Sequence, residues 1–179
     1  MRFDVFDFEA NGLNTMTTAL ITGFAPYAGR GRNPSAEIAE ALDGKRLGGL
    51  KIVGRALPVT YSTLQTELQN LMTVVKPRVV LSLGMWPGEA AIRLERIAIN
   101  VADFEIADNE GEVLVDAPIS GNGAAAAFAT APLRAIEEGL LDAGIPARIS
   151  STAGTFLCNA TLYTALGIVE TIHPKPLVG

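Results

Sequence analysis

The residues best suited to chemistry surround the only cysteine of the chain, Cys158, in the segment Ser151–Asn159. Residues 147–150 have the pattern of a short strand and residues 160–172 that of a helix, with Gly154 at the turn between them. This order places Cys158 near a helix N-terminus, where free backbone N–H groups favour a thiolate and can bind an oxyanion. The sequence predicts a nucleophilic thiol, with a buried cysteine that acts as a small hydrophobic residue as the alternative.

The composition of the 179 residues places the chain among compact globular proteins. Hydrophobic residues make up 49% and charged residues 18%, which is too apolar for a disordered chain. A net charge of −5 gives no indication of binding to nucleic acid or an anionic membrane, and no apolar run approaches the roughly 20 residues that span a bilayer. One cysteine excludes an intrachain disulfide and a cysteine-based zinc site, and one histidine argues against any zinc site. We therefore expect a cytoplasmic protein without a metal.

The first residues of the chain differ in character from the rest. Phenylalanines alternate with acidic residues between positions 3 and 9, and there is neither a basic region nor an apolar core of the kind found in signal peptides. We expect residues 1–17 to be an N-terminal extension and residues 18–179 to form the domain. An added strand is the alternative for the extension.

Strands that alternate with helices predict an α/β domain with helices on both faces of a largely parallel sheet. Nearly continuous apolar runs, as at residues 18–24, are typical of strands covered on both faces. Residues 117–130, rich in small side chains, are expected to be loop with some helix, and Ser35 is the expected N-cap of the first helix. The expected strands are residues 18–24, 51–60, 78–83, 93–100 and 147–150, and the expected helices are residues 35–42, 61–75, 132–143 and 160–172.

Three loops follow expected strands and are predicted to meet, because ligands of such folds bind at the carboxyl ends of the strands. They are residues 24–34, 84–93 and 154–158. The glycine-rich stretch 29–32 lacks the Gly-Lys-Ser/Thr ending of a phosphate-binding loop. An α/β enzyme for a phosphorylated or nucleoside substrate is therefore a weaker alternative.

Together these loops resemble those of pyroglutamyl-peptidase I, also called pyrrolidone carboxyl peptidase, from about Ala19 to Gly179. The resemblance implies a three-layer α/β/α sandwich with a mostly parallel mixed sheet. It also implies a cytosolic cysteine omega-peptidase that needs no cofactor, uses a Cys–His–Glu set and assembles into dimers or tetramers. Its partners would be pyroglutamyl peptides. The matching segments are Thr22–Tyr27, Asn33–Ser35, Glu95–Asn100, Asp108–Gly111 and Ala153–Asn159.

The resemblance also implies roles for single residues. Cys158 matches the nucleophile, and Glu95 matches the carboxylate that orients the histidine. The alternative for Glu95 is an exposed strand carboxylate paired with Arg93 or Arg96. Aromatic and neighbouring positions that line the pocket for the lactam ring are matched by Phe24, Tyr27, Asn33, Phe156 and Leu157, with core packing or helix capping as their alternatives.

The histidine of the family lies in a strand that would begin where this sequence ends. The only histidine, His173, matches a helix-end position and is expected to be structural. We therefore expect a truncated form of a longer enzyme, without its C-terminal strand and helix. The alternative is an inactive relative that binds pyroglutamyl N-termini without hydrolysing them.

Two further departures concern the pocket. Met85-Trp86-Pro87-Gly88 stands where many members of the family have Gln-Ala-Gly-Gly, and Glu105 stands where many have arginine. A glutamate cannot donate a hydrogen bond to an oxyanion. We expect the first departure to change the contacts of that loop with the pocket, and the glutamate to alter activity or substrate preference.

Overall fold

The computed structural model describes residues 17–179 of the chain. The extension predicted for residues 1–17 therefore lies outside the described residues, apart from Thr17. Strands and helices alternate along most of the described range. None of the helices between residues 17 and 179 is long and apolar enough to cross a membrane.

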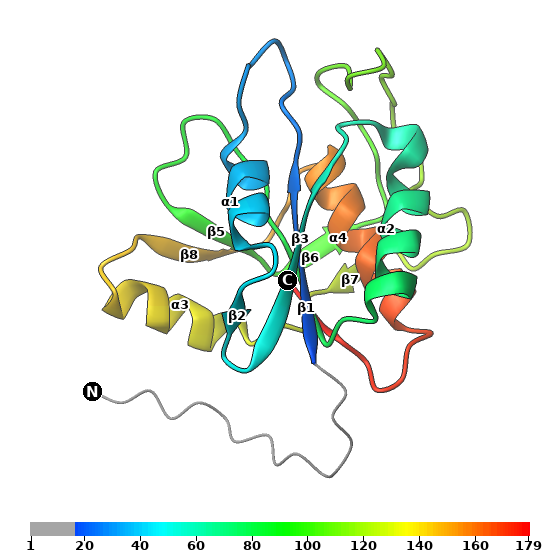
Figure 1. Cartoon of the computed structure of the whole chain (residues 1–179). Helices are drawn as coiled ribbons and strands as arrows, with labels where there is room; N and C mark the ends of the chain where they lie inside the picture. Colours follow the sequence, from blue (N-terminus) through cyan, green and yellow to red (C-terminus); the bar gives the residue numbers. More distant parts are fainter. Residues whose placement is uncertain (1–16) are drawn as a thin grey trace.

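A five-stranded sheet in the order β2-β3-β1-β4-β9 forms the centre of the molecule (Figure 1). β1 (Thr18–Phe24) pairs in parallel with β3 (Leu50–Leu57) on one side and with β4 (Val79–Ser82) on the other. β9 (Leu177–Val178) is parallel to β4, at the place where the resemblance predicted a strand to begin. β2 (Arg46–Leu47) is antiparallel to β3, so the sheet is mixed and mostly parallel, as predicted.

Helices cover both faces of this sheet (Figure 1). α1 (Pro34–Leu42) packs against β1 and β3 on one face. α2 (Tyr61–Val75) and α4 (Leu157–Val169) contact each other and cover the opposite face. The predicted three-layer α/β/α arrangement is therefore confirmed.

The central strand β1 is buried on both faces, as its apolar run predicted. Ile21 packs with Ala39 of α1, whereas the preceding residue of the strand, Leu20, packs with Met72 of α2 on the opposite face. Gly54 of β3 lets α1 approach closely, because a Cβ atom at this position would lie 1.8 Å from the carbonyl oxygen of Ala39. The absence of a side chain at Gly54 thus fixes the distance between α1 and the sheet.

Two small sheets lie outside the main one. β5 (Ile92–Glu95) pairs in parallel with β8 (Ala147–Ser150), and α3 (Leu133–Asp142) packs on β8. β6 (Ile97–Ile99) pairs in antiparallel fashion with β7 (Ala126–Phe128). β5 lies at the end of the predicted loop 84–93, and β8 precedes the predicted loop 154–158.

Two predictions for this region were wrong. Residues 93–100 form two strands instead of one, because the chain changes partner at Arg96: its N–H donates to the Ser150 carbonyl, and its own carbonyl accepts from Ala129. Residues 117–130 contain β7 and no helix. The small residues there serve close packing, since the Tyr163 hydroxyl of α4 donates a 2.6 Å hydrogen bond to the Ala124 carbonyl.

The helix ends agree with the sequence in part. α2 begins and ends as predicted. The N-cap of α1 is Asn33 and not Ser35, because Asn33 Oδ1 accepts a 3.1 Å hydrogen bond from the Ser35 amide. α4 begins at Leu157 instead of residue 160, which places Cys158 in its first turn.

Asp108 joins the loop after β6 to the start of α2. Its Oδ2 accepts a 2.8 Å hydrogen bond from the Tyr61 amide, and its Oδ1 accepts from the amides of Glu110 and Glu112 at 2.9 Å each. Burial by itself would raise the pKa of Asp108, but these backbone donors bring it below its usual range. The carboxylate therefore replaces the side-chain cap that Thr60 does not provide.

Asp108→Ala is expected to lower the free energy of unfolding by about 2 kcal/mol at neutral pH, since buried donors lose a charged acceptor. A carboxyl group whose pKa falls on folding stabilises the protein above its unfolded pKa of about 4, and this contribution is lost as the pH falls through the folded pKa. Urea unfolding from neutral to acid pH measures the difference, which should shrink in acid. The exposed Asp142→Ala is the control; an equal loss there would contradict the capping role.

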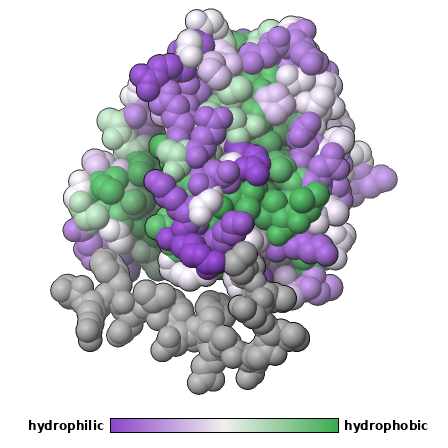
Figure 2. Space-filling model, in the orientation of Figure 1, coloured by the Kyte–Doolittle hydropathy of each residue, from purple (hydrophilic) through white to green (hydrophobic). Residues whose placement is uncertain are grey.

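Part of the surface is hydrophobic. α3 has no buried residue, and Leu141 and Ile145 are 53% and 41% exposed. Figure 2 shows hydrophobic residues gathered on the side of the molecule where β8 and α3 lie in Figure 1. Exposed apolar patches of this kind are typical of surfaces that contact another protein.

Candidate active site

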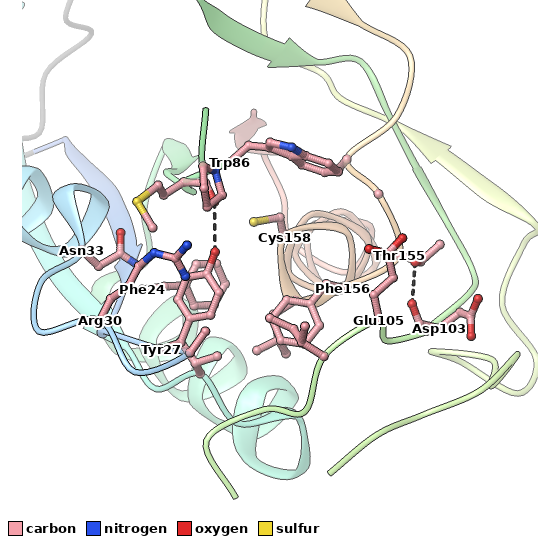
Figure 3. A pocket seen from close by; sticks show the side chains of 18 residues that line it. Phe24, Tyr27, Arg30, Asn33, Trp86, Asp103, Glu105, Thr155, Phe156 and Cys158 are labelled. Atoms are coloured by element: carbon pink, nitrogen blue, oxygen red, sulfur yellow. Dashed lines mark hydrogen bonds between the residues drawn. The ribbon is translucent and has the colours of Figure 1, made fainter. Parts of the chain in front are cut away.

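A cavity of about 400 Å³ lies where β1 and β4 end, between the three predicted loops and the loop that follows β6. Figure 3 shows the Cys158 side chain pointing into its centre. The structure brings six of the seven predicted site residues to its wall: Phe24, Tyr27, Asn33, Phe156, Leu157 and Cys158. The seventh, Glu95, does not line the cavity, but its charge acts on Cys158.

The sulfur of Cys158 is held between the first turn of α4 and the loop after β4. Cys158 is the second residue of α4 and is partly exposed to the cavity. On its other side lies Gly84, where an added Cβ atom would come within 2.6 Å of Sγ. The backbone of Gly84 therefore limits the positions that the sulfur can take.

The electrostatic surroundings of Cys158 favour the thiol. Burial raises its pKa to about 11; the Glu95 carboxylate adds to this rise, and the Arg93 guanidinium opposes it. This differs from the expectation that the helix N-terminus favours a thiolate, because burial and the Glu95 carboxylate both raise the pKa of Cys158. Cys158 consequently needs a base or a further cation before it can act as a nucleophile at neutral pH.

Glu95 ends β5 and is largely buried, with 24% of its side chain exposed. Its Oε1 lies 3.1 Å from Arg93 Nε, so the pairing with Arg93 that the sequence left open is present, while Arg96 bonds to Ser151 instead. Burial raises the pKa of the Glu95 carboxyl group, and neighbouring donors offset this only in part. Its Oε2 is buried and has no hydrogen-bond partner within residues 17–179.

Aromatic side chains form one wall of the cavity. The rings of Tyr27 and Phe156 are 6.3 Å apart, and Phe104 meets Phe156 edge to face at 4.7 Å. Burial raises the pKa of the Tyr27 phenol, which stays neutral and donates a 3.3 Å hydrogen bond to the Met85 carbonyl (Figure 3). Phe24 is also a core residue with 5% exposure, so its packing and lining roles coexist.

Asn33 and Ser35 fix the loop that carries this wall. Asn33 Nδ2 donates to the Ala25 carbonyl at 3.2 Å, and Asn33 Oδ1 accepts from the Ser35 hydroxyl at 2.8 Å. The Ser35 oxygen in turn accepts from the Phe24 amide at 2.9 Å. Asn33 thus caps α1 and lines the cavity at once.

The remaining wall was predicted only in part. Trp86, 60% exposed, and Glu105 belong to the two departures from the family, and both line the cavity. Arg30 lines it from the predicted loop 24–34, whereas Asp103 lines it without any local signal in the sequence. Asp103 is brought there by pairing with Thr155: its amide donates to the Thr155 carbonyl at 3.1 Å, and the Thr155 hydroxyl donates to its carbonyl at 2.6 Å.

His173 lies after α4, is exposed and does not line the cavity, which agrees with a structural role. In the described range, no three His, Cys, Asp or Glu side chains lie close enough to hold a metal ion. The functional groups that the site offers are therefore a thiol, a buried carboxylate, the amides at the start of α4 and an aromatic wall.

Comparisons with known proteins identify relatives of the chain. The family model described as pyroglutamyl peptidase matches residues 17–179. A pyrrolidone-carboxylate peptidase of Escherichia fergusonii is 44% identical over 151 residues, which cover 84% of this chain and 71% of that protein. Among solved structures, a mutant pyrrolidone carboxyl peptidase from Pyrococcus furiosus superposes with a TM-score of 0.89 at 37% identity, covering 91% of this chain and 78% of that one. The enzyme from Thermococcus litoralis gives 0.87 at 39% identity, covering 91% and 75%.

Proposed function

The chain belongs to the pyroglutamyl peptidase family of cysteine peptidases, and we propose that it removes N-terminal pyroglutamate from peptides with Cys158 as the nucleophile. The observation that carries this proposal is the cavity itself. It joins a cysteine in the first turn of a helix to an aromatic wall at the carboxyl ends of the strands. Both features are needed to hold a small ring beside a thiol.

The aromatic wall suits the lactam ring of pyroglutamate. This ring is small and uncharged and carries one amide, so it is bound by apolar surfaces and a few hydrogen bonds. Phe24, Tyr27 and Phe156 provide the surfaces, while Asn33 and Leu157 hold the loop and the helix that carry them. The carbonyl group outside the ring would then lie beside Cys158 Sγ.

The reaction follows from that placement. Cys158 Sγ bonds to the carbonyl carbon, the C–N bond to the next residue breaks, and the leaving amine takes up a proton. Water then hydrolyses the thioester and releases pyroglutamate. Phe156 gives α4 no side-chain cap, so the amides of the first turn are available to the oxyanion.

A base must remove the thiol proton, because the pKa of Cys158 is about 11. The buried Glu95 Oε2 lacks a donor in the described part of the chain, and a histidine N–H is the donor that a carboxylate in this role accepts. In this proposal the imidazole lies between Sγ and Oε2 and comes from the family histidine that the resemblance places after Gly179. His173 is exposed and does not line the cavity.

Release of the amine from a pyroglutamyl anilide tests the proposal. The 179-residue chain is assayed with and without added imidazole, beside Cys158→Ala under the same conditions. We expect imidazole to increase release by the chain, since free imidazole can take the place of a missing base, and Cys158→Ala to stay at the rate of the buffer. Release that is faster than in buffer and equal for the two proteins would exclude Cys158 as the nucleophile.

One observation favours a second function, binding of pyroglutamyl N-termini without hydrolysis. The cavity gathers six of the predicted site residues, yet no imidazole lines it within residues 17–179. Trp86 is the only tryptophan of the chain and lies on the cavity wall, so its fluorescence reports on binding. A pyroglutamyl peptide that changes this fluorescence but is not cleaved at any imidazole concentration would support binding alone.

The proposal extends to location and assembly. A cytoplasmic location is supported by the single cysteine, which fits a reducing compartment. Assembly into a dimer or tetramer is supported by the exposed hydrophobic side chains of Leu141 and Ile145 at α3. Sedimentation of the purified chain measures its assembly directly.

A further inference from the structure

One guanidinium group, that of Arg93, connects three parts of the site. Its Nε lies 3.1 Å from Glu95 Oε1, and its Nη2 donates to Ser150 Oγ at 3.0 Å and to the Thr152 carbonyl. Its Cζ lies 4.9 Å from the centroid of the Trp86 ring. We propose that Arg93 is a positioning residue, which holds Glu95, the loop before α4 and the Trp86 indole as one unit around Cys158.

The contact with Glu95 is an ion pair. Arg93 Nε lies 3.1 Å from Oε1 without hydrogen-bond geometry, because Nε is itself a buried donor without a partner in residues 17–179. Glu95 Oε2 is likewise a buried acceptor without a partner there. Only 14% of the Arg93 side chain and 24% of the Glu95 side chain are exposed, so solvent screens this pair much less than a surface pair. This step rests on the proposed function, in which Oε2 receives the histidine.

Arg93 also contacts the segment that leads to the helix of the nucleophile. Ser150 ends β8, and residues 151–156 lead from it to the helix of Cys158. The Ser150 hydroxyl also donates to the Thr152 carbonyl, at 2.9 Å. Arg93 therefore binds a turn that has an internal hydrogen bond of its own. The start of α4 is thereby tied to the strand that carries Glu95.

The Trp86 indole is held over the cavity by the same group. One face of the ring meets the Arg93 guanidinium, and an added Cβ atom at Gly154 would lie 3.4 Å from its Cζ3 atom. The indole is otherwise 60% exposed. Arginine suits this position better than lysine, because its planar guanidinium group can pair with a carboxylate and stack on an aromatic ring at the same time.

Several charged groups surround the thiol, and Arg93 is the cation that acts on it. Glu95 raises the pKa of Cys158 and Arg93 lowers it. Other polar or charged side chains line the same cavity: Tyr27, Arg30, Asp103 and Glu105. Removal of the charge at position 93 would therefore leave the effect of Glu95 on the Cys158 pKa unopposed by Arg93.

Two substitutions separate the effect of the Arg93 charge from the effect of its planar guanidinium group. Arg93→Met removes the charge and keeps the length of the side chain, whereas Arg93→Lys keeps the charge and removes the planar fork. Arg134→Met, at an exposed arginine paired with Glu137 on α3, is the matched control. Each 179-residue variant is compared with the unchanged chain by the pH profile of iodoacetamide alkylation at Cys158 and by the emission spectrum of Trp86, the single tryptophan.

Arg93→Met is expected to slow alkylation about threefold to tenfold near pH 8, because the thiolate fraction falls. Arg93→Lys should restore most of this rate but share the shifted Trp86 emission of Arg93→Met, since lysine cannot stack and pair together. Both readouts are independent of peptide cleavage, so they are interpretable even if the anilide assay shows no turnover. Wild-type alkylation and emission in both variants would overturn the proposal, as would equal changes in Arg134→Met.

Discussion

Gly84→Ala is expected to slow alkylation of Cys158, and any turnover that depends on it, about 100-fold, while the free energy of unfolding changes little. The added Cβ atom would lie 2.6 Å from Cys158 Sγ and 3.8 Å from Cys158 Cβ. The sulfur can escape this clash by rotating about the Cα–Cβ bond, which costs little stability. That rotation turns the nucleophile away from the cavity into which it points.

The measurement combines iodoacetamide alkylation and anilide release with urea unfolding of the same samples. Gly121→Ala is the matched control, because a Cβ atom there meets nothing within 4 Å. Unchanged alkylation in Gly84→Ala would show that the sulfur has another position from which it reacts. A large loss of stability would show that the clash is relieved by the backbone and not by the thiol.

The sequence located α2 accurately and α4 less so, for a physical reason. α2 has a regular stripe of buried side chains, Leu64, Leu68 and Met72, and it ends just before a proline. α4 begins at Leu157 after Phe156, and neither residue is a polar cap that would mark the start of a helix. Its buried face is also so broad that it shows little periodicity.

The candidate site could be predicted where it depends on single loops. Cys158 and the aromatic residues of the cavity wall were identified from their segments and from the family resemblance, and the structure gathers them around one cavity. Arg93 is different, because its contacts with Ser150 and Thr152 join residues 57 and 59 positions apart. Gly84 was recognised only as the end of a strand, and its contact with Cys158 depends on how α4 packs beside β4. Such pairings are set by tertiary packing, which no local pattern records.

Asn159, next to the nucleophile, shows how the fold supports the site. Its side chain is 1% exposed, and its Oδ1 accepts a 2.9 Å hydrogen bond from the Ile99 amide. Its Nδ2 donates to the carbonyls of Ile99 and Val101, at 2.9 Å each. One amide side chain thus joins the first turn of α4 to the end of β6. This link fixes how deep in the cavity Cys158 lies.

Asn159→Ala is expected to lower the free energy of unfolding by about 3–5 kcal/mol, because three partly buried backbone groups lose a buried partner and a cavity is left. Asn159→Asp should also destabilise the fold at neutral pH, since a carboxylate oxygen would face two carbonyl oxygens. Thr161→Val is the control on the same helix: Thr161 Oγ1 is buried and has no partner in the described range, so its replacement by a methyl group should be neutral or stabilising. Urea unfolding measures all three variants. If Asn159→Ala costs no more than Thr161→Val, the helix is held by apolar packing alone, and the depth of Cys158 must be set by Leu157 and Ala160 on its buried face.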